Sequence, residues 1–138
     1  MHRSVSSWLF VSVVVGALGI GCAAPPVGDP CTPESVPEGG FVPTEAYLET
    51  SSVQCQTRVC MVYKLEGDPR PGCTAPTRCP SDQDIQDRVY CTCRCRAPGD
   101  SNAKLCDCPD GYQCEDILTL GGPGVQGGYC VKSSTVTM

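Results

Sequence analysis

The sequence predicts a small disulfide-rich fold that is dominated by loops, with short antiparallel β-strands and little helix. The chain has 13 Cys among its 138 residues, and 12 of them follow residue 22. From residue 22 onwards, Leu, Ile, Val and Phe together number 18 of 117 residues, about 15%, which is too few for a large apolar core. Proteins of this composition are typically exported scaffolds in which disulfides replace apolar burial.

A third observation is that Cys91, Cys93 and Cys95 alternate within the stretch Arg88 to Arg96. In an extended strand, residues two apart face the same side, so these sulfurs should lie in one row roughly 7 Å apart. A disulfide needs Cβ atoms about 3.8 Å apart, so neighbours in the row should not pair. We therefore expect each of the three to bond to a different segment of the chain.

The first 21 residues are predicted to be a signal peptide. Residues 1–7 carry one Arg and no acidic residue, and Trp8 to Gly21 is an uncharged, largely apolar stretch. A membrane-spanning helix would need about 20 apolar residues, so the length favours a cleaved leader.

Gly21 and Cys22 resemble a bacterial lipoprotein signal, in which a small residue precedes a Cys that receives a diacylglyceryl group. The position three residues before the Cys is Gly19, where that family usually has Leu. The resemblance implies that Cys22 is the first mature residue and anchors the chain to a membrane. The chain as a whole is similar to Cys-rich predicted lipoproteins of Gram-negative bacteria, which implies the outer membrane or cell surface but no activity. The alternative is ordinary cleavage after Ala23, which would give a soluble secreted protein.

We expect a Pro-rich tether over 22–40, a disulfide-rich domain over 41–132 and a flexible tail over 133–138. With Cys22 set apart, an even number of cysteines remains, and these can pair as six disulfides that reduction should break to unfold the protein. Cys31 lies in the tether, and its partner should tie that segment to the domain. The pairing is left open, and the expected disulfide cysteines are Cys31, Cys55, Cys60, Cys73, Cys79, Cys91, Cys93, Cys95, Cys106, Cys108, Cys114 and Cys130.

Three further segments precede the central strand. Phe41 to Ser52 is the one stretch that favours a helix, with Thr44 as its cap. Val59 to Leu65 alternates in the manner of a strand with both faces buried. Ser81 to Asp87 is acidic and is expected to be a solvated loop.

The stretch from Cys106 to Tyr112, read as Cys-x-Cys-Pro-x-Gly-Tyr, resembles the C-terminal half of an EGF-like module. The resemblance extends to Cys130 and departs from the family at Cys114, which follows Tyr112 after a single residue. It implies a small hairpin with Gly111 in a tight turn.

An apolar run, Ile117 to Leu120, precedes a segment with five Gly in eight residues. One interpretation is an exposed contact patch beside a mobile loop. The favoured one is a strand and hairpin turn, with Ile117 and Leu120 packed against Tyr129 and Val131.

The residues argue against catalysis, and we predict that the protein is not an enzyme and has no cofactor or metal. The single His, His2, is lost with the leader, which removes the usual general base and the commonest metal ligand. The Cys-x-Cys repeats could be thiolate ligands, but an oxidising compartment favours disulfides, and a redox motif would be Cys-x-x-Cys.

Two groups of acidic residues could supply oxygen ligands to calcium, but the first fails the EF-hand spacing because Asp87 stands where Gly is required. We favour solvated acidic surfaces for both. The groups are Asp82, Asp84 and Asp87, and Asp107, Asp110, Glu115 and Asp116.

The mature chain has nine basic and 15 acidic residues, a net charge of −6, and no basic cluster. This argues against nucleic acid as a partner and leaves Cys22 as the means of membrane attachment. We expect a non-catalytic, lipid-anchored envelope or surface protein whose rigid domain binds a protein or glycan or has a structural role. The alternatives are a secreted ligand or inhibitor, and a metal-thiolate or redox protein.

Overall fold

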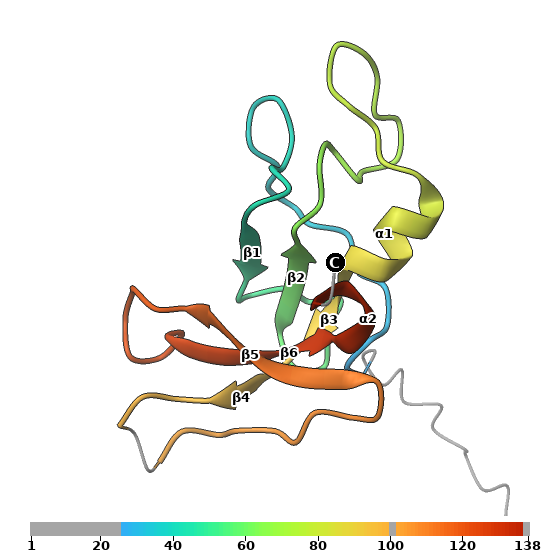
Figure 1. The fold of residues 1–138 in the computed structure, drawn as a ribbon. Coiled ribbons are helices and arrows are strands. Elements are labelled where there is room, and N and C mark those ends of the chain that lie inside the picture. Colours follow the sequence, from blue (N-terminus) through green and yellow to red (C-terminus); the bar gives the residue numbers. More distant parts are fainter. Residues whose placement is uncertain (1–25, 100–101, 137–138) are drawn as a thin grey trace, which may run out of the picture.

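The computed structural model describes residues 26–99 and 102–136, so the predicted leader and Cys22 lie outside the described residues. Two three-stranded antiparallel sheets form the body (Figure 1). This arrangement, with two short helices, confirms the predicted fold class. The first sheet has the order β1-β2-β3 and the second the order β4-β6-β5. The elements are β1 Ala46–Glu49, β2 Val59–Tyr63, α1 Asp82–Arg88, β3 Val89–Thr92, β4 Arg94–Arg96, β5 Tyr112–Leu118, β6 Gly127–Lys132 and α2 Ser133–Val136.

The predicted central strand is present as two strands, because the chain leaves the first sheet after Thr92 and enters the second at Arg94. Cys93 lies at this junction. The Thr92 hydroxyl donates to the carbonyl oxygen of Cys130 at 2.7 Å, and the Cys130 N–H donates to the carbonyl oxygen of Cys93 at 3.1 Å. The Cys-rich stretch thus joins the two sheets.

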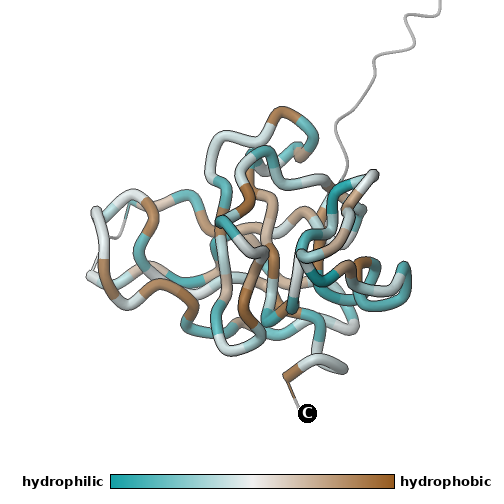
Figure 2. Tube along the Cα trace, turned by 90° about the horizontal axis from the view of Figure 1, so that it is seen from above, coloured by the Kyte–Doolittle hydropathy of each residue, from teal (hydrophilic) through white to brown (hydrophobic). Residues whose placement is uncertain are grey.

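The first sheet is buried on both faces, which explains why β2 and β3 carry apolar residues at successive positions. On one face, Val62 and Val89 belong to a cluster with Phe41 and four of the cysteines. On the other face, Met61 and Tyr90 pack with residues of the second sheet. Figure 2 shows apolar segments running through the middle of the molecule.

The helix predicted over Phe41 to Ser52 is wrong, because this segment contains strand β1. Tyr47 and Leu48 point to opposite faces of the sheet and pack against different clusters. A short segment with apolar contacts on both sides is stabilised as a strand, and tertiary packing overrides its weak helical preference.

The loop expected over Ser81 to Asp87 is also wrong, because these residues form most of α1. The Ser81 Oγ accepts a hydrogen bond from the Asp84 N–H at 3.1 Å and caps the helix. This capping pattern, a Ser followed three residues later by an acidic residue, is visible in the sequence.

The boundaries of the domain also need correction at both ends. The Gly28 N–H donates to the carbonyl oxygen of Cys91 at 2.8 Å, and the Cys91 N–H donates to that of Asp29 at 2.8 Å. Chain within the expected tether of 22–40 therefore belongs to the body. In the expected tail, residues 133–136 form α2, where Thr135 is buried.

The C-terminal hairpin follows the favoured interpretation, with one exception. β5 pairs with β6, and Ile117 packs against the cluster that contains Val131. Gly111 has a φ of 84° in a tight turn, which favours Gly there. Leu120, however, is 84% exposed and not in the core, because it lies beyond the end of β5.

Candidate functional site

Each cysteine of the described residues is in a disulfide. Cys91, Cys93 and Cys95 bond to Cys55, Cys106 and Cys114, so the three do reach three different segments. The other pairs are Cys31–Cys60, Cys73–Cys79 and Cys108–Cys130.

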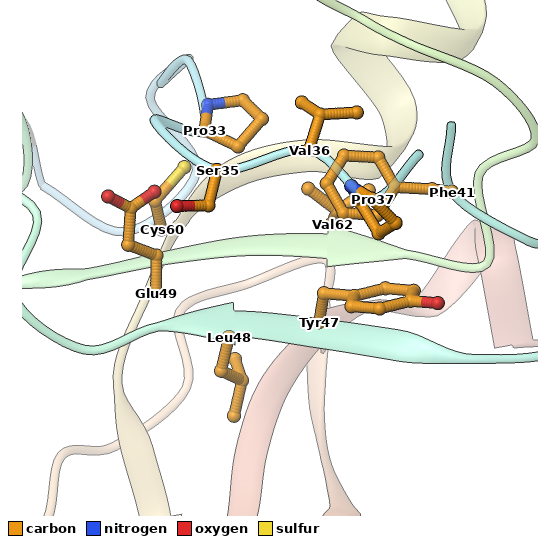
Figure 3. Close-up of a pocket in the computed structure, with 10 residues that line it drawn as sticks. All are labelled: Pro33, Ser35, Val36, Pro37, Phe41, Tyr47, Leu48, Glu49, Cys60 and Val62. Carbon is orange, nitrogen blue, oxygen red and sulfur yellow. The ribbon is translucent and has the colours of Figure 1, made fainter. Parts of the chain in front are cut away.

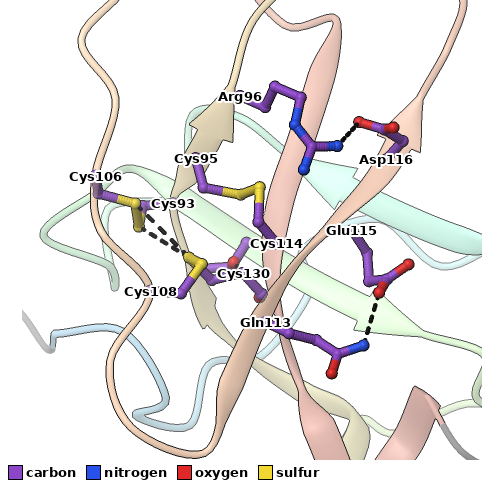
Figure 4. The surroundings of a disulfide bond; sticks show 11 residues. Cys93, Cys95, Arg96, Cys106, Cys108, Gln113, Cys114, Glu115, Asp116 and Cys130 are labelled. Carbon is purple, nitrogen blue, oxygen red and sulfur yellow. Dashed lines mark hydrogen bonds and ion pairs between the residues drawn. A yellow bond between two sulfur atoms is a disulfide. The ribbon is translucent and has the colours of Figure 1, made fainter.

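Three of the disulfides pack together around Cys130 (Figure 4). The Sγ of Cys130 lies 3.7 Å from that of Cys93 and 3.8 Å from that of Cys106. The sulfurs of Cys95 and Cys108 also lie within 4.8 Å of it. Sulfurs that are bonded to each other carry no proton and no thiolate charge, so these are packing contacts and offer no ligand to a metal.

The first predicted acidic group stabilises the fold at α1. The Ser81 hydroxyl donates to an Asp84 carboxylate oxygen at 2.6 Å, and this bond lowers the pKa of Asp84. The Asp87 carboxylate lies 3.8 Å from the ammonium group of Lys132. These carboxylates are therefore held by capping and ion pairing at separate places.

The second acidic group is also divided among local partners. Arg96 forms an ion pair with Asp116 at 2.7 Å, and the Gln113 side chain donates to Glu115 at 2.7 Å (Figure 4). Asp107 and Asp110 are exposed on the chain before β5. The four carboxylates do not form one of the metal-type clusters found among the described residues.

An apolar groove lies on the first sheet, beneath residues 32–40, which we call the strap. Before the strap, Cys31 is bonded to Cys60 of β2. After it, Phe41 and Gly67 exchange backbone hydrogen bonds of 2.8 and 2.9 Å. The strap is therefore fixed at both ends, and Cys31 ties the expected tether to the domain as predicted.

The groove has a volume of about 490 Å³, which is in the range of pockets that bind small molecules or single side chains. The strap forms one wall, β1 forms the other, and β2 forms the floor (Figure 3). Its lining includes Pro33, Val36 and Pro37 from the strap, Phe41, Tyr47 and Glu49, and Cys60 and Val62 from β2.

Contacts join the strap and Phe41 to β1 and to the chain that follows β1. The rings of Phe41 and Tyr47 lie 4.7 Å apart at one place. Elsewhere the Glu34 N–H donates to a Glu49 carboxylate oxygen at 2.9 Å. Gln54 also exchanges hydrogen bonds of 3.0 and 2.7 Å with the backbone of Thr32. The groove is therefore formed before any ligand binds.

The surroundings of the groove are acidic. Glu34, Glu38, Glu45 and Glu49 lie on the strap, on β1 or directly before β1, and the sequence has no Lys or Arg from residue 4 to residue 57. The Tyr47 hydroxyl donates to a Glu45 carboxylate oxygen at 2.8 Å, and this bond raises the pKa of Tyr47. The groove thus combines an apolar interior with negative charge at its rim.

A second cavity of about 510 Å³ lies beside Arg94 and Lys104. The Arg94 guanidinium donates to the carbonyl oxygens of Pro123 at 2.8 Å and Gln126 at 3.3 Å. The Arg94 guanidinium thus fixes the Gly-rich loop between β5 and β6. Because this cation is already used within the protein, the apolar groove is the stronger candidate for binding.

The sequence does not reveal the groove, because the Pro-rich pattern around Pro33, Val36 and Pro37 predicts a spacer. Their packing depends on the Cys31–Cys60 disulfide, a pairing that sequence alone leaves open. The one sequence feature that could have indicated packing of this segment is Phe41, a large apolar residue directly after the Pro-rich stretch.

Within residues 26–99 and 102–136, neither helix has the length and apolar character needed to cross a membrane. Comparisons with protein-family models, curated proteins and solved structures found no match.

Proposed function

We propose that this chain is a non-catalytic binding domain that is exported and held at the cell envelope or surface by a lipid on Cys22. The observation that carries the binding role is the groove beneath the strap, whose walls are fixed by a disulfide and by cross-wall contacts. A site that is already formed loses little conformational entropy when a ligand binds.

The disulfides support the exported location. Six disulfides form and persist in an oxidising compartment and are rare in a reducing cytosol. The lipid anchor rests on the resemblance at Gly21 and Cys22. One acyl chain holds a protein weakly, whereas the several chains of a bacterial lipoprotein would hold it firmly.

The test is the intact mass of the native protein from the membrane fraction, before and after reduction and alkylation. We expect the mass of residues 22–138 plus acyl chains, with 12 alkyl groups added only after reduction. A Cys22→Ser variant that remains in the membrane fraction would contradict the anchor.

The second candidate, a secreted soluble ligand or inhibitor, is favoured by the small residues at Gly21 and Ala23. It predicts an unmodified product in the medium that begins at Ala24. The metal-thiolate or redox alternative predicts cysteines that react with the alkylating agent before reduction.

A further inference from the structure

We propose that the groove beneath the strap captures an extended peptide segment of another protein, which adds to β1 as a further strand. The segment carries one apolar side chain for the groove and a Lys or Arg two residues away on each side. This inference rests on the binding role proposed above but is independent of the lipid anchor.

Strand β1 is an open edge of the first sheet. The order β1-β2-β3 leaves one side of β1 and one side of β3 without a neighbouring strand. Gly28 and Asp29 cover β3 through their hydrogen bonds to Cys91. Among the described residues, no corresponding segment pairs with the outer side of β1.

The register of the sheet shows which backbone groups are available. The Lys64 N–H donates to the carbonyl oxygen of Glu45 at 2.9 Å, so these residues form a hydrogen-bonded pair. Bonded and non-bonded pairs alternate along antiparallel strands. Ala46 and Leu48 therefore direct their N–H and C=O groups outward, where an added strand would pair with them.

The outer edge of β5 is less suited to this role. Glu115 and Asp116 lie in the middle of β5, and Asp116 is paired with Arg96 at 2.7 Å. Charged side chains on an edge strand oppose the addition of another strand. The β1 edge differs because an apolar groove lies directly beside it.

The groove selects the apolar side chain of the segment. Side chains alternate along a strand, so the peptide residue opposite Tyr47 projects to the groove face of the sheet. There it would contact the Tyr47 ring, which lines the β1 side of the groove. A volume of about 490 Å³ accommodates one large aliphatic or aromatic side chain.

Charge selects the flanking residues. Glu45 and Glu49 lie two residues to either side of Tyr47 and so share its face of the strand, roughly 13 Å apart. Peptide residues two positions from the apolar one would therefore meet these carboxylates. Exposed ion pairs of this kind each add modestly to affinity, and they also orient the segment and speed its association.

The experiment measures binding of a fluorescent peptide to the oxidised mature protein by anisotropy. The peptide has the sequence arginine-threonine-leucine-threonine-arginine, with blocked ends. We expect saturable binding that weakens about tenfold in the Glu45→Gln/Glu49→Gln variant, since two exposed ion pairs are lost. Glutamine at 49 keeps the oxygen that accepts from Glu34, so the groove is retained.

The matched control is Asp107→Asn/Asp110→Asn, which removes the same charge from exposed positions outside the groove. We expect its affinity to equal that of the unchanged protein. An equal loss in both variants would overturn the proposal, because it would show a non-specific response to net charge. No binding by the unchanged protein would also overturn it.

Methylated peptides test strand addition without altering the protein. With leucine opposite Tyr47, the threonine amides face β1 and the leucine amide faces away. N-methylation of a threonine should weaken binding by tenfold or more, and N-methylation of leucine should have little effect. Equal effects from both would exclude pairing with β1.

The lipid anchor is judged separately by mass, so either proposal can fail while the other holds.

Discussion

The two sheets are stabilised in different ways. In the first sheet, Met61 and Val62 of β2 and Val89 and Tyr90 of β3 are each at most 2% exposed. In the second sheet, the residues of β4 and β5 are half-buried or exposed, and β6 alone is largely buried. Three disulfides are concentrated in this second sheet and the chain that precedes β5.

The difference shows how a chain with few core residues can still fold. Burial of a large apolar side chain contributes roughly 1.5 to 3 kcal/mol, and the first sheet combines several such residues with two disulfides. In the second sheet, which has fewer buried apolar residues, each disulfide contributes about 2 to 4 kcal/mol because it restricts the unfolded chain. The second sheet relies mainly on this contribution.

The strongest test of this difference is removal of the three disulfides of the second sheet, with all six cysteines changed to Ala. Their combined contribution is about 9 kcal/mol, and it acts on the second sheet because the loops that they close lie within residues 93–130. We expect β5 and β6 amides to exchange with solvent rapidly while β2 and β3 retain measurable protection. Hydrogen exchange read by mass spectrometry would check this, and protected β5 amides would contradict it.

The next test compares one apolar residue from each sheet. Met61 is fully buried between the sheets, so Met61→Ala should lower the free energy of unfolding by about 3 kcal/mol. Leu118, at the end of β5, is partly exposed, and Leu118→Ala should cost less than about 1 kcal/mol. Urea denaturation measures both, and equal losses would show that the second sheet also depends on burial.

The comparison also explains what the sequence could predict. Counting Leu, Ile, Val and Phe against Cys indicated the disulfide-rich fold class. The spacing of Cys91, Cys93 and Cys95 indicated three separate partners, since this argument uses only strand geometry.

The remaining features depend on contacts that sequence does not specify. The division of the central stretch at Cys93 follows from its pairing with two sheets, and β1 follows from packing of Tyr47 and Leu48 on opposite faces. The groove depends on the Cys31–Cys60 disulfide, which brings together segments 29 residues apart. Only α1 had a local signal, the Ser81 cap, that could have corrected the expected loop.

A smaller effect is expected from Tyr90, which lies between the sheets. Burial raises its pKa far above the usual value of about 10. Above that pH, the unfolded chain loses the phenolic proton while folded Tyr90 keeps it, so this contribution to stability falls as pH rises. Its full contribution is present below about pH 10.

Tyr90→Phe should therefore flatten the loss of stability above about pH 10. At neutral pH it should cost about 1 kcal/mol, because the Tyr90 hydroxyl accepts a hydrogen bond from the Lys132 N–H at 3.0 Å. Urea denaturation from pH 7 to 11 would measure both effects. If the free energy of unfolding of the variant fell above pH 10 as steeply as that of the unchanged protein, Tyr90 would not be shielded from solvent between the sheets.

The smallest expected effect is confined to α1, the helix that leads into β3 of the first sheet. Ser81→Ala removes the oxygen that accepts from the Asp84 N–H and should lower the free energy of unfolding by about 1 kcal/mol. Ser51→Ala, at an exposed position, is the control and should change stability by less than about 0.5 kcal/mol. Hydrogen exchange should show faster opening of α1, with β5 and β6 unaffected. Faster exchange in β5 would mean that the two sheets unfold as one unit, because α1 reaches the second sheet through the shared core and through Lys132 of β6, whose ammonium group lies 3.8 Å from the Asp87 carboxylate.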